Sequence, residues 1–338
     1  MSIPVSVIIT CYNSEHFIRK TLEKIINQTM QNFEIICIDD CSSDATYTLV
    51  SDYAKNDRRI KAIRNQKNMG AAKSRNIGFE QSCGDYIIFL DDDDIYEPNL
   101  VEVAYENIKK YDVDILVYRS HGYDEEIQSS INTDWTINTP NIDAYEVFNK
   151  NDISRNFFQS FIWWAWDKIF KRTLIENNQI KFQNIPSAND MSFVVKAFLH
   201  SEKIIYINDR LITHIFERKN SISSTRAKRY MGSIYALSNV LNAVNEQNSN
   251  ENYMISFKNY SITYLEWYIN TISGDGFFSL FCEIKKFLLS MNISRDDLFE
   301  YHIFLAYERL LNLTPLEYLF SLKDRLTHER KIFLEKKS

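Results

Sequence analysis

The 338-residue chain carries a formal net charge of −6, and 45% of its residues are hydrophobic and 25% charged. Its length exceeds the usual size of one domain, and its composition is that of a soluble globular protein with a sizeable core. The acidic balance gives no electrostatic reason for binding nucleic acid, and it disfavours membrane attachment through overall charge.

The cysteines and the N-terminal sequence bear on the cellular compartment. Cys37 and Cys41 are separated by three residues, but no second cysteine or histidine pair completes a zinc site. We therefore expect reduced thiols in a cytoplasmic protein. The first residues, MSIPVSVIIT, lack the basic region of a signal peptide, and no uncharged apolar run reaches the roughly 18 residues of a membrane span. Peripheral contact with the inner face of the cell membrane is a further hypothesis.

Strand and helix signals alternate along the first part of the chain, which predicts an α/β fold with a largely parallel central sheet. Apolar runs at 35–38 and 87–90 fit strands that are covered on both faces. The predicted strands are residues 5–12, 33–40, 60–65, 86–90 and 114–120, with helices between them, including one within 68–82 and one from Pro98 to about Tyr111.

Strand signals stop at about Thr225, and a first helix is predicted within 229–247. Its apolar face holds Met231, Ile234, Leu237, Leu241 and Val244. Apolar helical patterns follow at 253–272, 276–292 and 298–313. The chain is therefore expected to divide into an α/β domain, residues 1–224, and a helical C-terminal domain, residues 225–338. The C-terminal helices are candidates for contact between two copies of the chain.

Two acidic clusters come directly after predicted strands: Asp39-Asp40 and Asp91 to Asp94. In parallel sheets, ligands bind beyond the carboxyl ends of the strands. Asp91 and Asp93 alternate and can point the same way, as a site for Mn²⁺ or Mg²⁺ requires, while Asp92 faces backbone amides or a nucleotide. A solvated acidic turn is the alternative. A calcium loop is disfavoured because the required glycine and distal glutamate are missing.

Other residues near these strand ends allow both a functional and a structural interpretation. Asp39 and Asp40 can accept hydrogen bonds from a base or ribose, or Asp40 can cap the next helix. Lys73 and Arg75 can meet phosphates, or they can simply neutralise the acids. Tyr12 can stack on a base, or it can belong to the core.

Taken together and in order, five segments resemble family 2 glycosyltransferases with the GT-A fold. They are VSVIITCYN (5–13), QTMQNFEIICIDDCSSD (28–44), NMGAAKSRNIGFEQSCGDYIIFLDDDDIYEPNL (68–100), WDKIFKR (166–172) and NDMSF (189–193). The resemblance covers roughly the first two-thirds of the chain. It implies a Rossmann-like GT-A domain that transfers a sugar from a nucleoside diphosphate sugar, by default a UDP-sugar, to a hydroxyl group with inversion.

The resemblance also implies roles for individual residues. The metal motif falls on Asp91, Asp93 and Asp94, with Asp92 in the variable position. The catalytic base is Asp190, although Asn189 replaces the acid that usually precedes it, which bears on acceptor orientation or on tuning of the base. Together with the residues selected from the sequence itself, the expected ligands of the nucleotide sugar are Thr10, Tyr12, Asn13, Asp39, Asp40, Lys73, Arg75, Asp91, Asp92 and Arg218, and the expected ligands of Mn²⁺ or Mg²⁺ are Asp91 and Asp93.

The sequence departs from the family pattern at three further positions, and one aromatic segment allows two interpretations. Cys41 stands where the family usually has glycine, so a non-glycine residue must tolerate that backbone. In the segment 214–223, Phe216 and Glu217 replace residues that the family pattern leads one to expect. Arg218 remains a candidate for closing over the diphosphate. His214 is either a further contact to the metal or phosphate, or a structural residue. The tryptophans at 163, 164 and 166 are either a platform for sugar rings or core.

The acceptor implied by the resemblance is a glycan or a lipid-linked glycan, in the biosynthesis of a surface polysaccharide such as lipopolysaccharide or capsule. Basic clusters at 217–230 and 324–338 can touch anionic lipid headgroups or lie on a solvated helix surface. A non-catalytic nucleotide-sugar-binding subunit of a glycan assembly complex is the alternative function. A nucleotidyltransferase would need a glycine-rich phosphate loop, which TCYNSEHF lacks.

Overall fold

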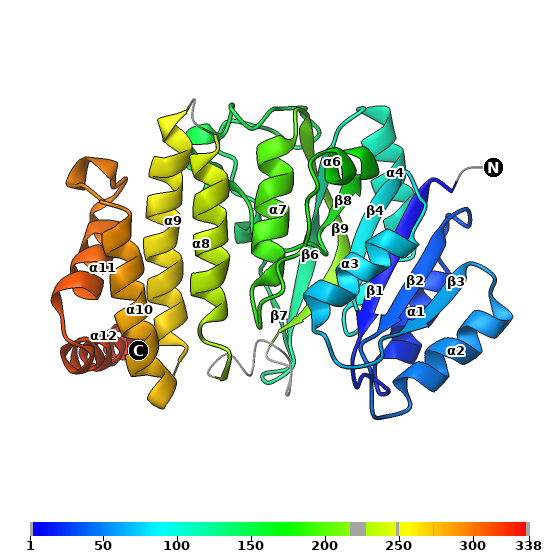
Figure 1. The fold of residues 1–338 in the computed structure, drawn as a ribbon. Helices are drawn as coiled ribbons and strands as arrows, with labels where there is room; N and C mark the ends of the chain where they lie inside the picture. Colours follow the sequence, from blue (N-terminus) through cyan, green and yellow to red (C-terminus); the bar gives the residue numbers. More distant parts are fainter. Residues whose placement is uncertain (1–2, 217–227, 248–249, 273, 336–338) are drawn as a thin grey trace.

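A computed structural model describes residues 3–216, 228–247, 250–272 and 274–335. One mixed sheet is flanked by helices on both faces, and a layer of helices extends from one side of it (Figure 1). The strands are β1 (Val5–Cys11), β2 (Glu34–Asp39), β3 (Ile60–Arg64), β4 (Tyr86–Asp91), β5 (Ile95–Tyr96), β6 (Ile115–Asp124), β7 (Ser129–Ile131), β8 (Lys168–Lys171) and β9 (Ile204–Phe216). The helices of the sheet region are α1 (Ile18–Ile26), α2 (Thr46–Asn56), α3 (Ala71–Gln81), α4 (Leu100–Lys110), α5 (Phe157–Ser160), α6 (Arg172–Asn177) and α7 (Asn189–His200).

The strand order β3-β2-β1-β4-β8-β6-β9-β5 joins a parallel half to a mixed half. The strands β3, β2, β1 and β4 are parallel, as predicted. Strand β8 then runs antiparallel to both β4 and β6, so β6 points the same way as β4. Within the parallel half, Thr10 pairs with Asp91 and Cys11 with Asp39. This register brings the two acidic clusters to either side of the end of β1.

Alternate residues of the central strands enter two different cores, because side chains on a strand point to opposite faces. Val7 and Ile9 of β1 belong to the core beneath α1 and α4, whereas Ile8 belongs to the core beneath α3 and α7. Helix α3 lies very close to the sheet: a β-carbon at Gly78 would be 2.4 Å from Ile8 Cγ2. Glycine at this position therefore allows the close packing that holds α3 against β1.

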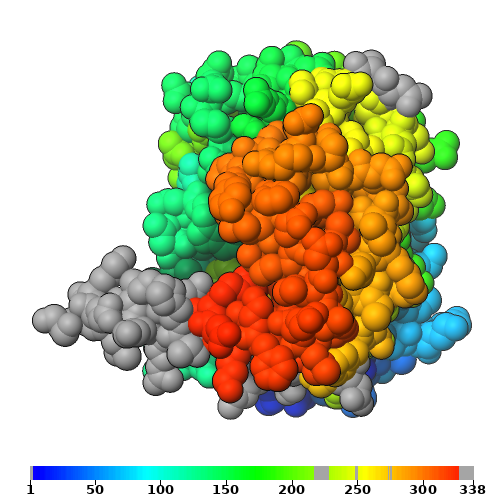
Figure 2. Space-filling view, turned by 90° about the vertical axis from the view of Figure 1, so that its left-hand side faces the viewer, coloured from blue at the N-terminus to red at the C-terminus, as the bar shows by residue number. Residues whose placement is uncertain are grey.

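The C-terminal helices continue the core on the α3 and α7 side. They are α8 (Gly232–Asn245), α9 (Glu251–Asn270), α10 (Asp275–Ser290), α11 (Tyr301–Asn312) and α12 (Pro315–Glu335). One buried cluster runs from Ile8 of the sheet to Tyr318 of α12, whose ring lies 5.2 Å from that of Phe281 in α10. Figure 2 shows α10, α11 and α12 covering this end of the molecule. The first four C-terminal helices match the predicted ones, and α12 adds to them.

Two expectations remain, one about the domain boundary and one about membrane spans. The predicted domain boundary at 224/225 falls within 217–227, outside the described residues, and stays a prediction. Among the residues that the structure describes, no helix is both long enough and apolar enough to span a membrane.

Candidate functional site

Most of the predicted site residues gather at the carboxyl ends of β1, β2 and β4. Thr10 is largely buried at the end of β1, beside Asp91 of β4. The next residue but one, Tyr12, has a side chain that is 50% exposed, and its backbone N–H donates a hydrogen bond of 3.2 Å to Asp92 Oδ2. Asp92 thus faces a backbone amide, as one of the two predicted orientations has it.

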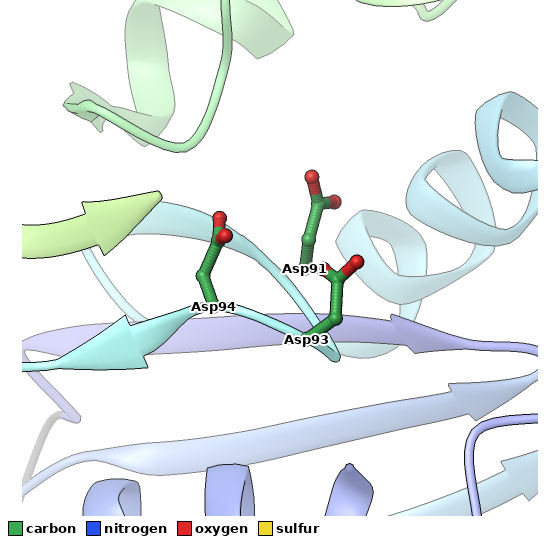
Figure 3. A group of neighbouring side chains, drawn as sticks. All are labelled: Asp91, Asp93 and Asp94. Carbon is green, nitrogen blue, oxygen red and sulfur yellow. The ribbon is translucent and has the colours of Figure 1, made fainter. Parts of the chain in front are cut away.

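Three carboxylates form a compact oxygen-rich group after β4. One oxygen from each of Asp91, Asp93 and Asp94 lies within 4.8 Å of the others. Figure 3 shows the three side chains rising from the same side of the chain. Carboxylate oxygens at this spacing suit a hard divalent cation such as Mg²⁺ or Mn²⁺, whose coordination a substrate phosphate can complete. The donor set therefore fits the predicted metal.

Asp94 is the buried member of the three acids, and contacts with β9 hold its side chain. The side chain is buried, and its Oδ1 lies 2.9 Å from His214 Nδ1 and accepts a hydrogen bond of 3.1 Å from Ile215 N–H. The His214 ring stacks on Trp166 at 4.8 Å. Burial lowers the pKa of His214, but the Asp94 carboxylate outweighs it, so the pKa is raised above its ordinary value. The structure thus places His214 against Asp94, where it fixes the acidic loop to β9.

Arg75 connects the acidic loop with the predicted base. Its Nη2 donates a hydrogen bond of 2.6 Å to Asp91 Oδ1, and its Nη1 donates one of 2.7 Å to Asn189 Oδ1. The guanidinium group is buried and lies 5.4 Å from the ring centre of Phe182. The sequence offered Arg75 as either a phosphate contact or a neutraliser of the acids. In this structure it neutralises Asp91.

The predicted base, Asp190, is half-buried in the first turn of α7. Burial raises the pKa of Asp190, the Arg75 charge opposes that rise, and the Asp91 charge adds to it. Close by, burial raises the pKa of Asp167 to about 6, although Lys168 Nζ lies only 2.5 Å from Asp167 Oδ1 and acts against the rise. A carboxylate with a raised pKa is a better proton acceptor near neutral pH, as a general base requires.

Asp39 and Asp40 play different parts in the structure. Asp39 is fully buried: its Oδ2 accepts a hydrogen bond of 3.1 Å from Ser42 N–H and lies 3.3 Å from Arg64 Nε, while its Oδ1 has no hydrogen-bond partner within the described ranges. Asp40 is saturated by the loop after β3, accepting from Asn65 Nδ2 and from the backbone N–H groups of residues 69 and 70. A buried acceptor without a partner needs an explanation, and a ligand hydroxyl is one.

A hollow of about 470 Å³ lies beside these two acids. Its lining contains Arg64, which is paired with Asp39, and Asn65, which is paired with Asp40. The sequence interpretation missed both residues. Arg64 ends β3 and Asn65 follows it, at the same edge of the sheet, so the rule that selected the acidic clusters applies to them as well. The complete lining is Arg64, Asn65, Gln66, Lys67 and Met69.

Four residues from the sequence analysis remain, and they differ in their surroundings. Asn13 ties two loops together, because its Oδ1 accepts a hydrogen bond of 2.9 Å from Ser43 N–H. Lys73 is exposed in the first turn of α3. Arg218 lies outside the described residues. Cys41 adopts a φ of 63°, the left-handed region that glycine occupies without strain, so the predicted tolerance of a non-glycine residue there is confirmed.

The chain resembles known proteins over most of its length. It is 32% identical to glycosyltransferase GlyA of Streptococcus pneumoniae over 67% of its length but only 32% of GlyA, and 32% identical to the cholesterol galactosyltransferase of Borreliella burgdorferi over 65% of its length and 62% of that protein. The crystal structure of S. aureus TarS with UDP-GlcNAc superposes with a TM-score of 0.65, at 22% identity, over 85% of this chain and 81% of that one.

The TarS likeness shows that the fold is shared, and the mixed sheet with a helical C-terminal region is the GT-A arrangement that was predicted. The sequence profile of "Glycosyl transferase family 2" matches residues 6–177, which is more than half of the chain. The chain therefore belongs to glycosyl transferase family 2.

Proposed function

We propose that the chain transfers a sugar from a nucleoside diphosphate sugar, with UDP as the nucleotide, to a hydroxyl group of a glycan or glycolipid. The observation that carries this proposal is the link through Arg75 between the acids after β4 and the helix that starts with Asn189 and Asp190. The buried guanidinium group of Arg75 thereby connects the acids proposed to bind the metal and diphosphate with the helix that carries the candidate base. The UDP-GlcNAc complex of TarS supports UDP as the nucleotide.

The donor nucleoside is assigned to the hollow beside Asp39. The Oδ1 atom of Asp39 is a buried acceptor that a ribose hydroxyl or a base N–H would satisfy. The half-exposed ring of Tyr12 offers an aromatic face to the base. Thr10, Asn13, Asp40 and Asp92 are assigned to the nucleotide sugar together with these two groups, and Lys73 and Arg218 are assigned to the phosphates.

Asp91 and Asp93 are proposed to hold Mn²⁺ or Mg²⁺, and Asp94 supports them from its contact with His214. When bound, the ion stabilises the negative charge that develops on the leaving diphosphate. Two neighbouring residues hold the acidic loop in position. Arg75 binds the Asp91 carboxylate, and Tyr96 Oη donates a hydrogen bond of 2.5 Å to the Asp91 carbonyl.

Asp190 is proposed to take the proton from the acceptor hydroxyl as that oxygen attacks the anomeric carbon. A single displacement of this kind inverts the configuration at that carbon and uses no protein nucleophile. The raised pKa of Asp190 suits a base that works near neutral pH. Asn189 keeps the Arg75 contact without adding a second negative charge beside the base.

Purified protein tests this proposal by release of nucleoside diphosphate from UDP-, GDP- and TDP-sugars, with Mn²⁺ or with EDTA. We expect turnover of one donor that EDTA abolishes and that Asp93→Ala and Asp190→Ala each lose. Asp52→Ala is the matched control, because Asp52 is 58% exposed on α2 and its carboxylate pairs with Lys55 on the surface of the same helix. Donor binding without turnover of any donor, even with crude glycan acceptors, would favour a non-catalytic binding subunit instead.

The cellular setting remains part of the proposal. A surface polysaccharide or glycolipid is the proposed product, and its synthesis would take place on the cytoplasmic side with peripheral contact at the membrane. The curated name of the Borreliella burgdorferi relative gives a lipid acceptor, cholesterol, for that protein. Co-sedimentation with anionic vesicles tests the membrane contact, and protein that stays in the supernatant would contradict it.

A further inference from the structure

One tryptophan is half exposed and yet fixed in orientation. The side chain of Trp135 is 53% exposed, in the short 3₁₀ turn η1 (Asp134–Thr136). Its Nε1 donates a hydrogen bond of 3.0 Å to the Asn132 carbonyl, and its ring meets the edge of Trp164 at 6.0 Å. The turn itself is anchored by Thr133, whose Oγ1 donates a hydrogen bond of 2.6 Å to the Ser120 carbonyl. Trp135 therefore presents a large apolar surface to solvent at a fixed position.

Fixed polar groups adjoin this ring. Asp134 is 61% exposed, and its carboxylate accepts a hydrogen bond from Arg210 Nη2. The neighbouring Arg119 donates a hydrogen bond of 3.3 Å from Nη1 to the Asp134 carbonyl. An irregularity in the pairing of β6 with β9 at Arg119 brings both arginines to this turn. The Arg210 pairing lowers the pKa of Asp134, so the group is a carboxylate at neutral pH.

A continuous run of rings connects Trp135 with the acidic cluster. Trp164 contacts Trp135 at one edge and stacks on Trp166 at 4.8 Å. Trp166 in turn stacks on His214, which binds Asp94. The Trp164 carbonyl also accepts a hydrogen bond of 2.9 Å from Lys168 Nζ, a charge that acts on Asp190. The aromatic surface is thus built into the same framework as the proposed metal site and base.

We propose that Trp135, with Asp134 and the edge of Trp164, is a subsite for a pyranose ring of the acceptor glycan. The apolar face of a pyranose packs on an indole ring, and its hydroxyls donate to a carboxylate that is already held in place. This inference rests on the proposed function, because it assigns the sugar to the acceptor rather than to an unrelated ligand.

The sheet order favours the acceptor over the donor as the occupant. The hollow assigned to the nucleoside lies after β3, the first strand in the sheet order. The turn that carries Trp135 is anchored to Ser120 of β6, on the far side of β4 and β8. Because β4 and β6 point the same way, both places lie at the carboxyl edge, on opposite sides of Asp91 to Asp94. An acceptor in an inverting reaction approaches from the side away from the leaving group.

Saturation-transfer NMR on the full chain, with UDP and the diamagnetic ion Mg²⁺ present, tests the subsite. The probes are methyl glycosides of glucose, galactose, mannose and N-acetylglucosamine, together with lactose and cellobiose. We expect at least one of them to bind wild-type protein, and Trp135→Ala to bind it about tenfold more weakly. Asp134→Asn should weaken binding less. Trp267→Ala is the matched control, because Trp267 is 49% exposed on α9 and should leave binding unchanged.

Two results would overturn the subsite: no saccharide of the panel binds wild-type protein, or Trp135→Ala binds as wild type does. Unchanged circular dichroism and thermal unfolding of Trp135→Ala show that a loss of binding is local. Saccharide binding needs no turnover, so it is independent of the donor assay. Trp135-dependent saccharide binding by a protein that neither binds nor turns over any donor would contradict the proposed function but keep a carbohydrate site.

Discussion

Arg75 Nη1 donates a hydrogen bond of 2.7 Å to Asn189 Oδ1, across 114 residues of sequence. The same guanidinium group binds Asp91. One planar cation therefore fixes the distance between the acids after β4 and the first turn of α7, where Asp190 lies. The planar guanidinium group donates its two hydrogen bonds in fixed directions, which a lysine ammonium group cannot do.

Replacement of Arg75 by lysine should therefore separate charge from geometry. Lysine keeps the positive charge beside Asp91 but cannot reach Asp91 and Asn189 with a planar fork. We expect donor turnover to fall by at least about 100-fold, and the free energy of unfolding in urea to fall by about 1–2 kcal/mol. Arg75→Met, which also removes the charge, should cost more stability than Arg75→Lys. Equal turnover for Arg75→Lys and wild type would show that the bridge does not position the site.

Asn189→Asp should move the acid limb of the pH–rate profile to higher pH. Asp190 must be deprotonated to act as a base, so activity is lost as the pH falls through its raised pKa. A carboxylate at 189 would favour the protonated form of Asp190 and raise that pKa further, both directly and by competing for Arg75. The measurement is kcat/KM against pH between about 5 and 8. Asn189→Gln adds no charge and should leave the limb in place, whereas a downward shift in Asn189→Asp would contradict Asp190 as the base.

Cys41→Gly should stabilise the protein. A residue with a side chain in the left-handed region, as Cys41 is, costs about 1–2 kcal/mol of folding free energy. Glycine avoids this cost, but about half of the gain is lost because glycine raises the conformational entropy of the unfolded chain. We expect the free energy of unfolding to rise by about 0.5–1 kcal/mol in urea titrations. Cys41→Ala is the control, since it loses the 3.7 Å contact of Sγ with the Gln66 carbonyl but keeps the β-carbon. A gain in the alanine variant equal to that in the glycine variant would refute a backbone cause.

Local sequence patterns sufficed to predict β1 to β4, β6 and the place of the acidic clusters, but they did not predict β5, β7, β8 or β9. Each cluster follows an apolar run directly, and the carboxyl ends of parallel strands meet at one edge, so Asp39 and Asp91 were expected at the same edge. The structure places both beside the end of β1. The left-handed turn at Cys41 was also predictable, because a family position that favours glycine implies a particular φ.

Contacts between distant segments were beyond the same reasoning. The pairing of Arg75 with Asn189 depends on how α3 and α7 pack on one face of the sheet, which no local spacing encodes. The antiparallel insertion of β8 and the contact of His214 with Asp94 depend likewise on the order of the strands. Of the three clustered tryptophans, Trp163 and Trp166 are buried, and only Trp164 reaches the exposed ring of Trp135. Composition alone does not distinguish a buried tryptophan from one that reaches the surface.

Asp39 and Asp40 are adjacent and identical, yet they should fail in different ways when each is changed to asparagine. Asp39→Asn replaces one oxygen by an NH₂ group where Oδ1 is a buried acceptor without a protein partner. A lost hydrogen bond to a charged group corresponds to about 1.5–3 kcal/mol, so UDP should bind roughly 10- to 150-fold more weakly by calorimetry. The loss of charge beside Arg64 adds to this effect.

Asp40→Asn should instead lower stability. Both oxygens of Asp40 accept hydrogen bonds, from Asn65 Nδ2 and the N–H of Met69 on one side and from the N–H of Gly70 on the other. An amide NH₂ must face at least one of these donors, and an unmade buried hydrogen bond costs about 1–3 kcal/mol of unfolding free energy. Urea titration and UDP calorimetry on both variants give a two-by-two comparison. If Asp39→Asn lost stability but kept its UDP affinity, Asp39 would be a structural residue and the nucleoside would have to bind elsewhere.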